Sequence, residues 1–394
     1  MDTLNRFAGR AFIATMALVM YVGCQSDAPQ TPVLAAEPDV PADGSTTPAA
    51  PDEAQLARGQ ELYVQFCDFC HGDNGEGYLA DNANALSNQN FLATASDEFL
   101  RSSIVQGRPG TPMSGWGRVA GGPLDDAQVD DLIAFIRQWQ TVPSVVLSDT
   151  TAVEGVATRG TGVYNARCAS CHGADGEGVS AVSLNNPWFH AAASDGFIEH
   201  AIVNGRPGTT MGAYGETLSP VAIADLVAFI RQWKRDPNAP PEAPYTPDLA
   251  NGVINPEGPA PSFVLREDRF VPADQVKAAV DAGQRVIIMD ARPTGDYRDG
   301  HITGALGLPF YELENWIEQL PRDTFIVTYC GCPHAVSGQA LDALRAAGFT
   351  QNAILDEGYY VWAERGYGIV TGDAPGVPGQ ETPGEASGEG SATP

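Results

Sequence analysis

Two short segments of the chain share an arrangement of side chains that can attach a porphyrin. They read Cys67-Asp68-Phe69-Cys70-His71 and Cys168-Ala169-Ser170-Cys171-His172. In a C-x-x-C-H segment, the two thiols can add to the two vinyl groups of one porphyrin, and the adjacent histidine can bind the iron as an axial ligand. The spacing therefore predicts two covalently bound haem c groups, attached at Cys67 and Cys70 and at Cys168 and Cys171. His71 and His172 are the predicted proximal ligands.

Two other kinds of site use similar cysteine spacings. A redox C-x-x-C of the thioredoxin type requires a βαβ context, and a zinc site requires further cysteines or histidines nearby. Neither segment has these neighbours. We therefore favour haem attachment at both segments.

Each C-x-x-C-H segment lies within a longer repeat. In the first copy, residues 52–63 predict a helix that leads into Cys67, and apolar residues at 129, 132, 133 and 136 recur at helical spacing near the end of the copy. The strings Gly-Arg-Pro-Gly-Thr-x-Met and Ala-Phe-Ile-Arg-Gln-Trp occur in both copies. Two long copies indicate a duplicated domain rather than a solenoid.

Met113 and Met211 end the repeated Gly-Arg-Pro-Gly-Thr-x-Met strings. A thioether is a soft ligand that favours Fe(II), so coordination by histidine and methionine raises the reduction potential. An isolated loop methionine is usually a packing residue, but the same context occurs twice after a haem segment. His190 and His200 are rival ligands, and we expect them to be surface or core residues because the first copy has no matching histidine.

Both copies resemble class I cytochrome c domains, and together they resemble a dihaem cytochrome c. In that family a first helix leads to C-x-x-C-H, a loop supplies methionine as the sixth ligand, and a C-terminal helix packs across the first. The resemblance implies two all-α domains, at residues 52–141 and 155–236, that carry electrons. It also implies that His71 and Met113 ligate one iron, and that His172 and Met211 ligate the other.

The pattern changes in the region 263–371. Residues 285–290 and 325–329 read as strands, helical sequence lies between them, and residues 338–347 predict a further helix. Strands that alternate with helices favour a parallel α/β sheet, in which chemistry is located at the carboxyl ends of the strands. Cys330 lies there, directly after a predicted strand. The expected fold is thus two all-α domains followed by an α/β domain.

This third region resembles a rhodanese, a sulfurtransferase domain. The motifs that carry the resemblance are Asp290-Ala291-Arg292, Tyr297, residues 300–305 with Leu308-Pro309, and Tyr329-Cys330 before the loop 331–337. In that family backbone N–H groups surround the cysteine sulfur, lower the thiol pKa and hold a persulfide. The resemblance implies that Cys330 takes a sulfane sulfur from a donor and passes it to a thiophilic acceptor.

The loop after Cys330 departs from the family pattern. Its only basic residue is His334, and Cys332 could form a mixed polysulfide or a strained link with Cys330. An inactive rhodanese fold, kept for docking or sensing, stays open as an alternative. We expect Asp290 and Arg292 to be structural residues that pin the loop through hydrogen bonds.

The N-terminus is typical of an export signal. Arg6 and Arg10 precede an apolar run at residues 11–22, which ends at Tyr21-Val22-Gly23-Cys24. That end resembles a bacterial lipobox, although tyrosine is atypical at its first position. The resemblance implies a signal peptide over residues 1–23 and acylation of Cys24, a lipid anchor that needs no membrane-spanning helix. Ordinary cleavage or an uncleaved anchor stay open, and all three place the protein on the periplasmic side of a bacterial membrane.

Composition describes the remaining segments and the charge. Residues 24–51 predict a disordered tether, residues 237–262 a linker and residues 372–394 a disordered tail. The net charge of -27 argues against nucleic acid and favours cationic redox partners.

The sequence therefore predicts a membrane-anchored periplasmic dihaem electron carrier with a rhodanese-like domain. One alternative is a dihaem oxidoreductase that acts on a sulfur compound or peroxide. The other is an electron-transfer subunit whose rhodanese domain only docks partners.

Overall fold

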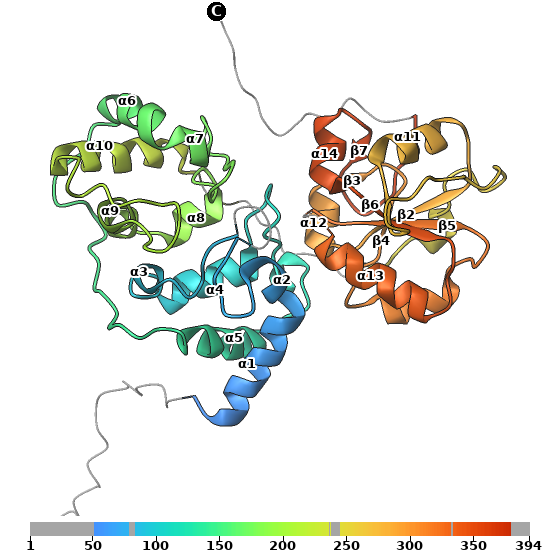
Figure 1. The fold of residues 1–394 in the computed structure, drawn as a ribbon, viewed down its shortest axis with the longest axis horizontal. Helices are drawn as coiled ribbons and strands as arrows, with labels where there is room; N and C mark the ends of the chain where they lie inside the picture. Colours follow the sequence, from blue (N-terminus) through green and yellow to red (C-terminus); the bar gives the residue numbers. More distant parts are fainter. Residues whose placement is uncertain (1–50, 79–82, 236, 238–244, 332–333, 380–394) are drawn as a thin grey trace, which may run out of the picture. The chain divides into compact units, whose positions relative to one another are not determined.

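The structure, a computed structural model, describes residues 51–78, 83–235, 237, 245–331 and 334–379 (Figure 1). The predictions for the signal peptide, for Cys24, for the tether up to residue 50, for Cys332 and for residues 380–394 lie outside the described residues. Within the described ranges, none of the helices combines the length and the apolar character needed to cross a bilayer.

The first C-x-x-C-H copy folds into helices, as predicted. They are α1 (Glu53–Phe66), α2 (Asp68–His71), α3 (Gln89–Leu92), α4 (Asp97–Gln106) and α5 (Asp126–Arg137), with a 3₁₀ turn at Arg118–Ala120. Side chains fix where the two long helices begin. The Asp52 carboxylate accepts from the backbone N–H of Gln55 at the start of α1, and Asp125 and Gln128 form a capping box at the start of α5.

The second copy repeats this order. Its helices are α6 (Ala157–Arg167), α7 (Ala169–His172), α8 (Pro187–Ala192), α9 (Asp195–Asn204) and α10 (Pro220–Ile230), with a 3₁₀ turn at Arg231–Trp233. Ser194 and Ser219 cap α9 and α10, and proline occupies the first turn of α8 and of α10. Both proline positions suit a helix start, where the missing N–H has no partner to lose.

In each copy the first and last helices cross at a glycine (Figure 1). A Cβ at Gly59 of α1 would lie 2.1 Å from the carbonyl oxygen of Asp131 in α5, and a Cβ at Gly160 of α6 would lie 2.2 Å from that of Asp225 in α10. Only glycine lets the backbones approach so closely. The predicted packing of the C-terminal helix across the first is therefore confirmed in both copies.

The third region is an α/β domain with a parallel sheet, as predicted. Its sheet strands are β1 (Phe270–Val271), β2 (Val286–Asp290), β4 (Leu306–Gly307), β5 (Phe325–Tyr329) and β6 (Asn352–Leu355), in the order β1-β6-β5-β2-β4. Strands β3 (His301–Ile302) and β7 (Ile369–Val370) form a separate antiparallel pair. The helices are α11 (Ala273–Asp281), α12 (Thr294–Asp299), α13 (Ala335–Ala346) and α14 (Gly358–Glu364). Short 3₁₀ turns occupy Leu249–Asn251, Leu313–Asn315 and Ile317–Gln319.

Cys330 lies at the carboxyl edge of the sheet, as the sequence predicts. Every residue of β2 is buried, and Cys330 directly follows β5 at the carboxyl edge of the sheet. Helix α13 begins at Ala335, three residues before the predicted start, directly after His334 in the left-handed conformation (φ 71°). Parts of the predicted linker and tail contact the domain: Ile254 bridges to Val286, and the Ala374 carbonyl lies 3.1 Å from Nε2 of His301.

The helix crossing makes a testable prediction on α6. Gly160→Ala should lower the free energy of unfolding by about 1–3 kcal/mol, because its methyl group overlaps the α10 backbone. Gly162→Ala is the matched control, since a Cβ there meets nothing within 4 Å. It should leave stability unchanged or raise it by up to about 1 kcal/mol. Thermal unfolding of the two variants measures both changes. If both variants lost the same stability, the two helices would not be in close contact at Gly160.

Candidate functional site

Local helical geometry brings each C-x-x-C-H segment together. Cys67 ends α1, and the N–H of His71 donates to the Cys67 carbonyl at 2.9 Å. The second copy has the same bond, from His172 to Cys168, also at 2.9 Å. One helical turn therefore places both cysteines and the histidine of each segment on one side, since residues three and four apart share a face.

Each haem-segment histidine is fixed through one ring nitrogen. Nδ1 of His71 donates to the Asn84 carbonyl at 2.8 Å, and Nδ1 of His172 donates to the Val182 carbonyl at 2.8 Å. The proton on Nδ1 leaves the Nε2 lone pair available for a metal. Burial lowers the pKa of both histidines, which favours the neutral, metal-binding form.

The two methionine loops have the same internal hydrogen bonds. In the first loop the Arg108 N–H donates to the Met113 carbonyl at 2.7 Å, and the Thr111 hydroxyl donates to the Arg108 carbonyl at 2.7 Å. In the second loop the corresponding bonds, from Arg206 to Met211 and from Thr209 to Arg206, measure 2.9 and 2.8 Å. The repeated string thus folds into a closed loop that presents its methionine twice in the same way.

The first site has the chemistry that a haem requires. Cys67, Cys70, His71 and Met113 line one cavity together with Phe66, Phe69 and Trp116. Apolar walls with two thiols, an imidazole and a thioether fit a porphyrin and its iron. Burial raises the pKa of Cys67 to about 12, the opposite of the lowered thiol pKa of a redox C-x-x-C.

The rival histidines of the second copy lie in helices α8 and α9. His190 is buried in α8, and Nη1 of Arg231 lies 3.2 Å from its Nδ1. Because a guanidinium only donates, Nδ1 must accept, so the ring proton sits on Nε2 and leaves no lone pair there for iron. Among the described residues, Nδ1 of His200 in α9 is buried without a hydrogen-bond partner.

Sequence reasoning missed two tyrosines that support the haem segments. The Tyr63 hydroxyl donates to the Gly72 carbonyl at 2.7 Å, and the Tyr164 hydroxyl donates to the Gly173 carbonyl at 2.8 Å. Each bond holds the residue that follows a haem-segment histidine. The signal was present in the sequence, because a tyrosine stands four residues before the first cysteine in both copies.

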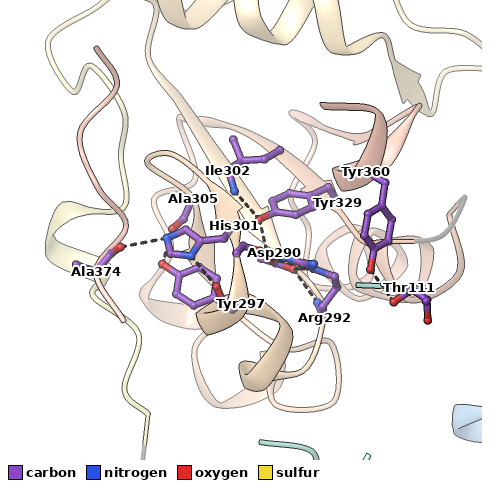
Figure 2. A network of polar contacts seen from close by, with 11 residues as sticks. Thr111, Asp290, Arg292, Tyr297, His301, Ile302, Ala305, Tyr329, Tyr360 and Ala374 are labelled. Atoms are coloured by element: carbon purple, nitrogen blue, oxygen red, sulfur yellow. Dashed lines mark hydrogen bonds and ion pairs between the residues drawn. The ribbon is translucent and has the colours of Figure 1, made fainter. Parts of the chain in front are cut away.

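A buried polar network lies at the carboxyl end of β2 (Figure 2). Arg292 donates to both carboxylate oxygens of Asp290, with Nη2 to Oδ2 at 2.6 Å, and also to the Gly300 carbonyl at 2.6 Å. The Tyr329 hydroxyl donates to Asp290 at 2.6 Å and accepts from the N–H of Ile302 at 3.1 Å. Burial alone would lower the pKa of Arg292, but the Asp290 charge outweighs it and the pKa is raised, so the guanidinium stays charged.

Cys330 lies beside this network and is buried, with 2% of its surface exposed. Its Sγ is 3.2 Å from the hydroxyl oxygen of Ser337, a fully buried residue in the first turn of α13. His334 is directed elsewhere, because its Nε2 donates to the Asp356 carbonyl at 2.8 Å. Ser337 is thus a neighbour of the sulfur that sequence reasoning missed, since one serine near a helix start carries no specific signal.

Comparison with known proteins agrees with this division of the chain. A family model described as cytochrome C oxidase, cbb3-type, subunit III matches residues 54–136 and 155–230. A second model, described as rhodanese-like domain, matches residues 272–365.

Individual relatives cover parts of the chain. The cbb3-type cytochrome c oxidase subunit CcoP of Rubrivivax gelatinosus is 28% identical over 185 residues, which cover 46% of this chain and 55% of the relative. The subunit FixP of Azorhizobium caulinodans is 27% identical over 189 residues, 46% of this chain and 61% of the relative. A solved thiosulfate sulfurtransferase from Pseudomonas aeruginosa is 24% identical with a TM-score of 0.25, and covers 26% of this chain and 20% of that one. The chain thus spans little more than half the length of the curated relatives it matches.

Fold and site together define a multidomain redox protein of the cytochrome c class. Residues 54–136 and 155–230 belong to the cbb3-type cytochrome c subunit family, and residues 272–365 belong to the rhodanese-like family. The chain therefore contains cytochrome c domains, which imply covalently bound haem c, and a rhodanese-like domain.

The buried pair of the rhodanese-like domain makes a second prediction. Arg292→Met should lower the free energy of unfolding by about 3–5 kcal/mol, because it leaves the Asp290 charge buried without its partner. Adding Asp290→Asn should restore part of the loss. Lys277→Gln, which breaks the surface pair with Asp281, is the control and should cost less than about 1 kcal/mol. Urea unfolding measures all three, and a small loss in Arg292→Met would contradict the role given to the pair.

Proposed function

We propose that this chain is an exported carrier with two haem c groups, whose rhodanese-like domain transfers sulfane sulfur through Cys330. The observation that carries the proposal is the duplicated ligand geometry. In both copies a histidine fixed through Nδ1 is followed by a closed methionine loop with the same internal bonds. The proposed domain boundaries remain those predicted from the sequence.

Cys67 and Cys70 would hold one haem, with His71 and Met113 as iron ligands. Cys168, Cys171, His172 and Met211 would hold the other. When bound, such a group supplies one-electron redox chemistry at its iron. Around it, the carbonyls of Asn84 and Val182 orient the histidines, and the loop bonds keep each thioether in place without a protein movement during electron transfer.

Reciprocal contacts join the two methionine loops to the opposite copies. The Asn88 side chain donates to the Pro207 carbonyl at 2.8 Å, and the Asn186 side chain donates to the Pro109 carbonyl at 3.0 Å. The rings of Phe99 and Phe197 stack with centroids 4.7 Å apart. These paired contacts support a carrier in which the two sites exchange electrons as one unit.

The remaining parts of the proposal concern location and partners. Export, a lipid anchor at Cys24 and a periplasmic location rest on the N-terminal signal pattern. The net charge of -27 supports cationic redox partners, which long-range attraction would steer to the protein at low salt.

For sulfur transfer, the Cys330 thiolate attacks the outer sulfur of a donor such as thiosulfate. A bond forms to that sulfur, sulfite leaves, and Cys330 carries a persulfide. A thiophilic acceptor then takes the outer sulfur and restores the thiolate, so no electron is gained or lost overall. The Ser337 hydroxyl, 3.2 Å from Sγ, supports this role because it can donate to the anionic sulfur.

Haem content tests the first part of the proposal. The pyridine haemochrome of the purified protein should correspond to two c-type groups per chain, and to one in a Cys168→Ser/Cys171→Ser variant. Met113→Ala and Met211→Ala should each remove about half of the sulfur-to-iron absorption band of the oxidised protein. A band that neither variant changes would contradict methionine ligation.

Ser337→Ala tests the second part. The thiol pKa of Cys330 should rise by about one unit, because one hydrogen bond to a charged sulfur is lost. The pH profile of iodoacetamide alkylation, measured in a Cys332→Ser background, reports this shift. Sulfur transfer from thiosulfate to cyanide at neutral pH should fall in parallel, with Cys330→Ser as the baseline. Ser262→Ala, at an exposed serine of the predicted linker before this domain, should change neither quantity. If the unaltered protein transfers no more sulfur than Cys330→Ser, the docking alternative holds.

A further inference from the structure

Residues from two regions of the chain line the cavity at the first haem site. Cys67, His71 and Met113 line it from the cytochrome c side, and Arg292, Cys330 and Gly331 line it from the rhodanese-like domain. All described residues fall in one compact unit that begins at Pro51. Cys330 and the first C-x-x-C-H segment therefore line the same cavity.

A hydrogen bond joins the first methionine loop to helix α14 of the rhodanese-like domain. The Tyr360 hydroxyl donates to the Thr111 carbonyl at 2.6 Å (Figure 2). Thr111 belongs to the first methionine loop, and its hydroxyl closes that loop on Arg108. The residue before Tyr360, Tyr359, donates its N–H to the Cys330 carbonyl at 2.9 Å. A short path of bonded groups thus leads from the methionine loop to Cys330.

Apolar contacts surround this hydrogen bond. The Phe310 ring lies 6.0 Å from that of Phe66 and 6.5 Å from that of Trp116, both edge-on. Phe66 and Trp116 are buried and line the same cavity. The Tyr311 hydroxyl adds a bond to the Gly121 carbonyl at 3.2 Å. Together these aromatic rings give the cavity apolar walls where the two parts of the chain meet.

The two methionine loops share one kind of contact and differ in another. Pro207 of the second loop accepts from Asn88 of the first copy, and Pro109 of the first loop accepts in the same way from Asn186 of the second copy. The bond from Tyr360 goes to the first loop, and Cys330 lines the cavity at the first segment. Within the part of the chain that the structure describes, these contacts set Cys330 against the first site.

We propose that the rhodanese-like domain closes the cavity of the first haem site with the described residues Arg292, Cys330 and Gly331, so that the charge on the Cys330 sulfur acts on that haem and not on the second. The inference rests on the proposed function, because it takes haem to be attached at Cys67 and Cys70. An anionic sulfur next to the haem stabilises ferric iron, since charges beside apolar walls interact more strongly than charges in bulk water. The protein would thereby sense whether Cys330 is thiol, thiolate or persulfide through the potential of one haem.

The first test compares two substitutions of similar size in the haem-loaded protein. Cys330→Asp introduces a fixed negative charge, and Cys330→Asn provides the neutral match. In a spectroscopic redox titration, the midpoint potential of the first haem should be lower in the Asp variant, while that of the second should coincide in the two variants. Met211→Ala identifies which titration wave belongs to the second haem. The proposal would be overturned if the first haem had the same midpoint potential in the Asp and Asn variants, or if only the second haem differed between them.

A second measurement decides the matter if the Asp variant does not fold. In the haem-loaded protein with Cys332→Ser, Tyr311→Phe/Tyr360→Phe removes both hydroxyl bonds across the cavity and should make alkylation of Cys330 by iodoacetamide about fivefold faster. Tyr214→Phe is the matched control, because its hydroxyl also donates to a carbonyl, that of Arg167 at 3.3 Å, in the second copy. If Cys330 is alkylated at the same rate in the Cys332→Ser parent, the double tyrosine variant and the Tyr214→Phe variant, the rhodanese-like domain does not close the cavity.

These outcomes separate the inference from the function on which it rests. Loss of the first haem, seen by pyridine haemochrome, would remove the proposed function itself. Two bound haems with unshifted potentials and unchanged alkylation would leave the carrier intact and refute only the closure. Absence of sulfur transfer together with a shifted first wave would refute sulfur transfer and leave the closure standing.

Discussion

The close crossing of two helices at a glycine is the constraint on which the position of both C-x-x-C-H segments depends. In each copy the helix that ends in the first haem cysteine touches the backbone of the last helix, at Gly59 and at Gly160. An aspartate of the last helix, Asp131 or Asp225, is nearly buried at the contact and accepts two bonds from an arginine of the first helix. The arginines are more than half exposed, so each pair contributes modestly to stability but fixes how the helices cross.

That crossing determines where the haem segment lies. Because Cys67 and Cys168 end the first helices, any tilt of a helix moves the attachment point and the histidine with it. Tyr63 and Tyr164 pack on the aromatic residues of the last helices and also hold the carbonyls of Gly72 and Gly173. One contact surface therefore supports both the fold and the ligand position. A single added methyl group at this contact would shift the helix that carries the C-x-x-C-H segment, because protein interiors are packed without spare volume.

The sequence predicted features that rest on local or repeated patterns. Two C-x-x-C-H segments, two methionine loops and the strand before Cys330 were all visible, because spacing and periodicity are properties of short stretches. The proximity of Ser337 to Cys330 was not visible, since serine near a helix start usually serves as a cap. The bond between Tyr360 and Thr111 joins residues 249 positions apart and leaves no local pattern. Asp290 and Arg292 were predicted to pin the loop after Cys330. Among the described residues, Arg292 instead donates to Asp290 and to the Gly300 carbonyl, and it also borders the cavity that Cys330 lines.

The duplication explains how one chain can hold two sites of the same ligand type with different behaviour. A copied domain begins with the same iron ligands and hence with similar intrinsic properties, so later differences must come from what packs against it. The two loops share reciprocal contacts, Asn88 to Pro207 and Asn186 to Pro109, and the first loop also accepts from Tyr360 through the Thr111 carbonyl. The cavity at the first segment is lined by Cys330 and by Arg292 of the buried pair. Because solvent access and nearby charge tune a bound haem, these contacts distinguish the surroundings of two copies that share the same ligand types.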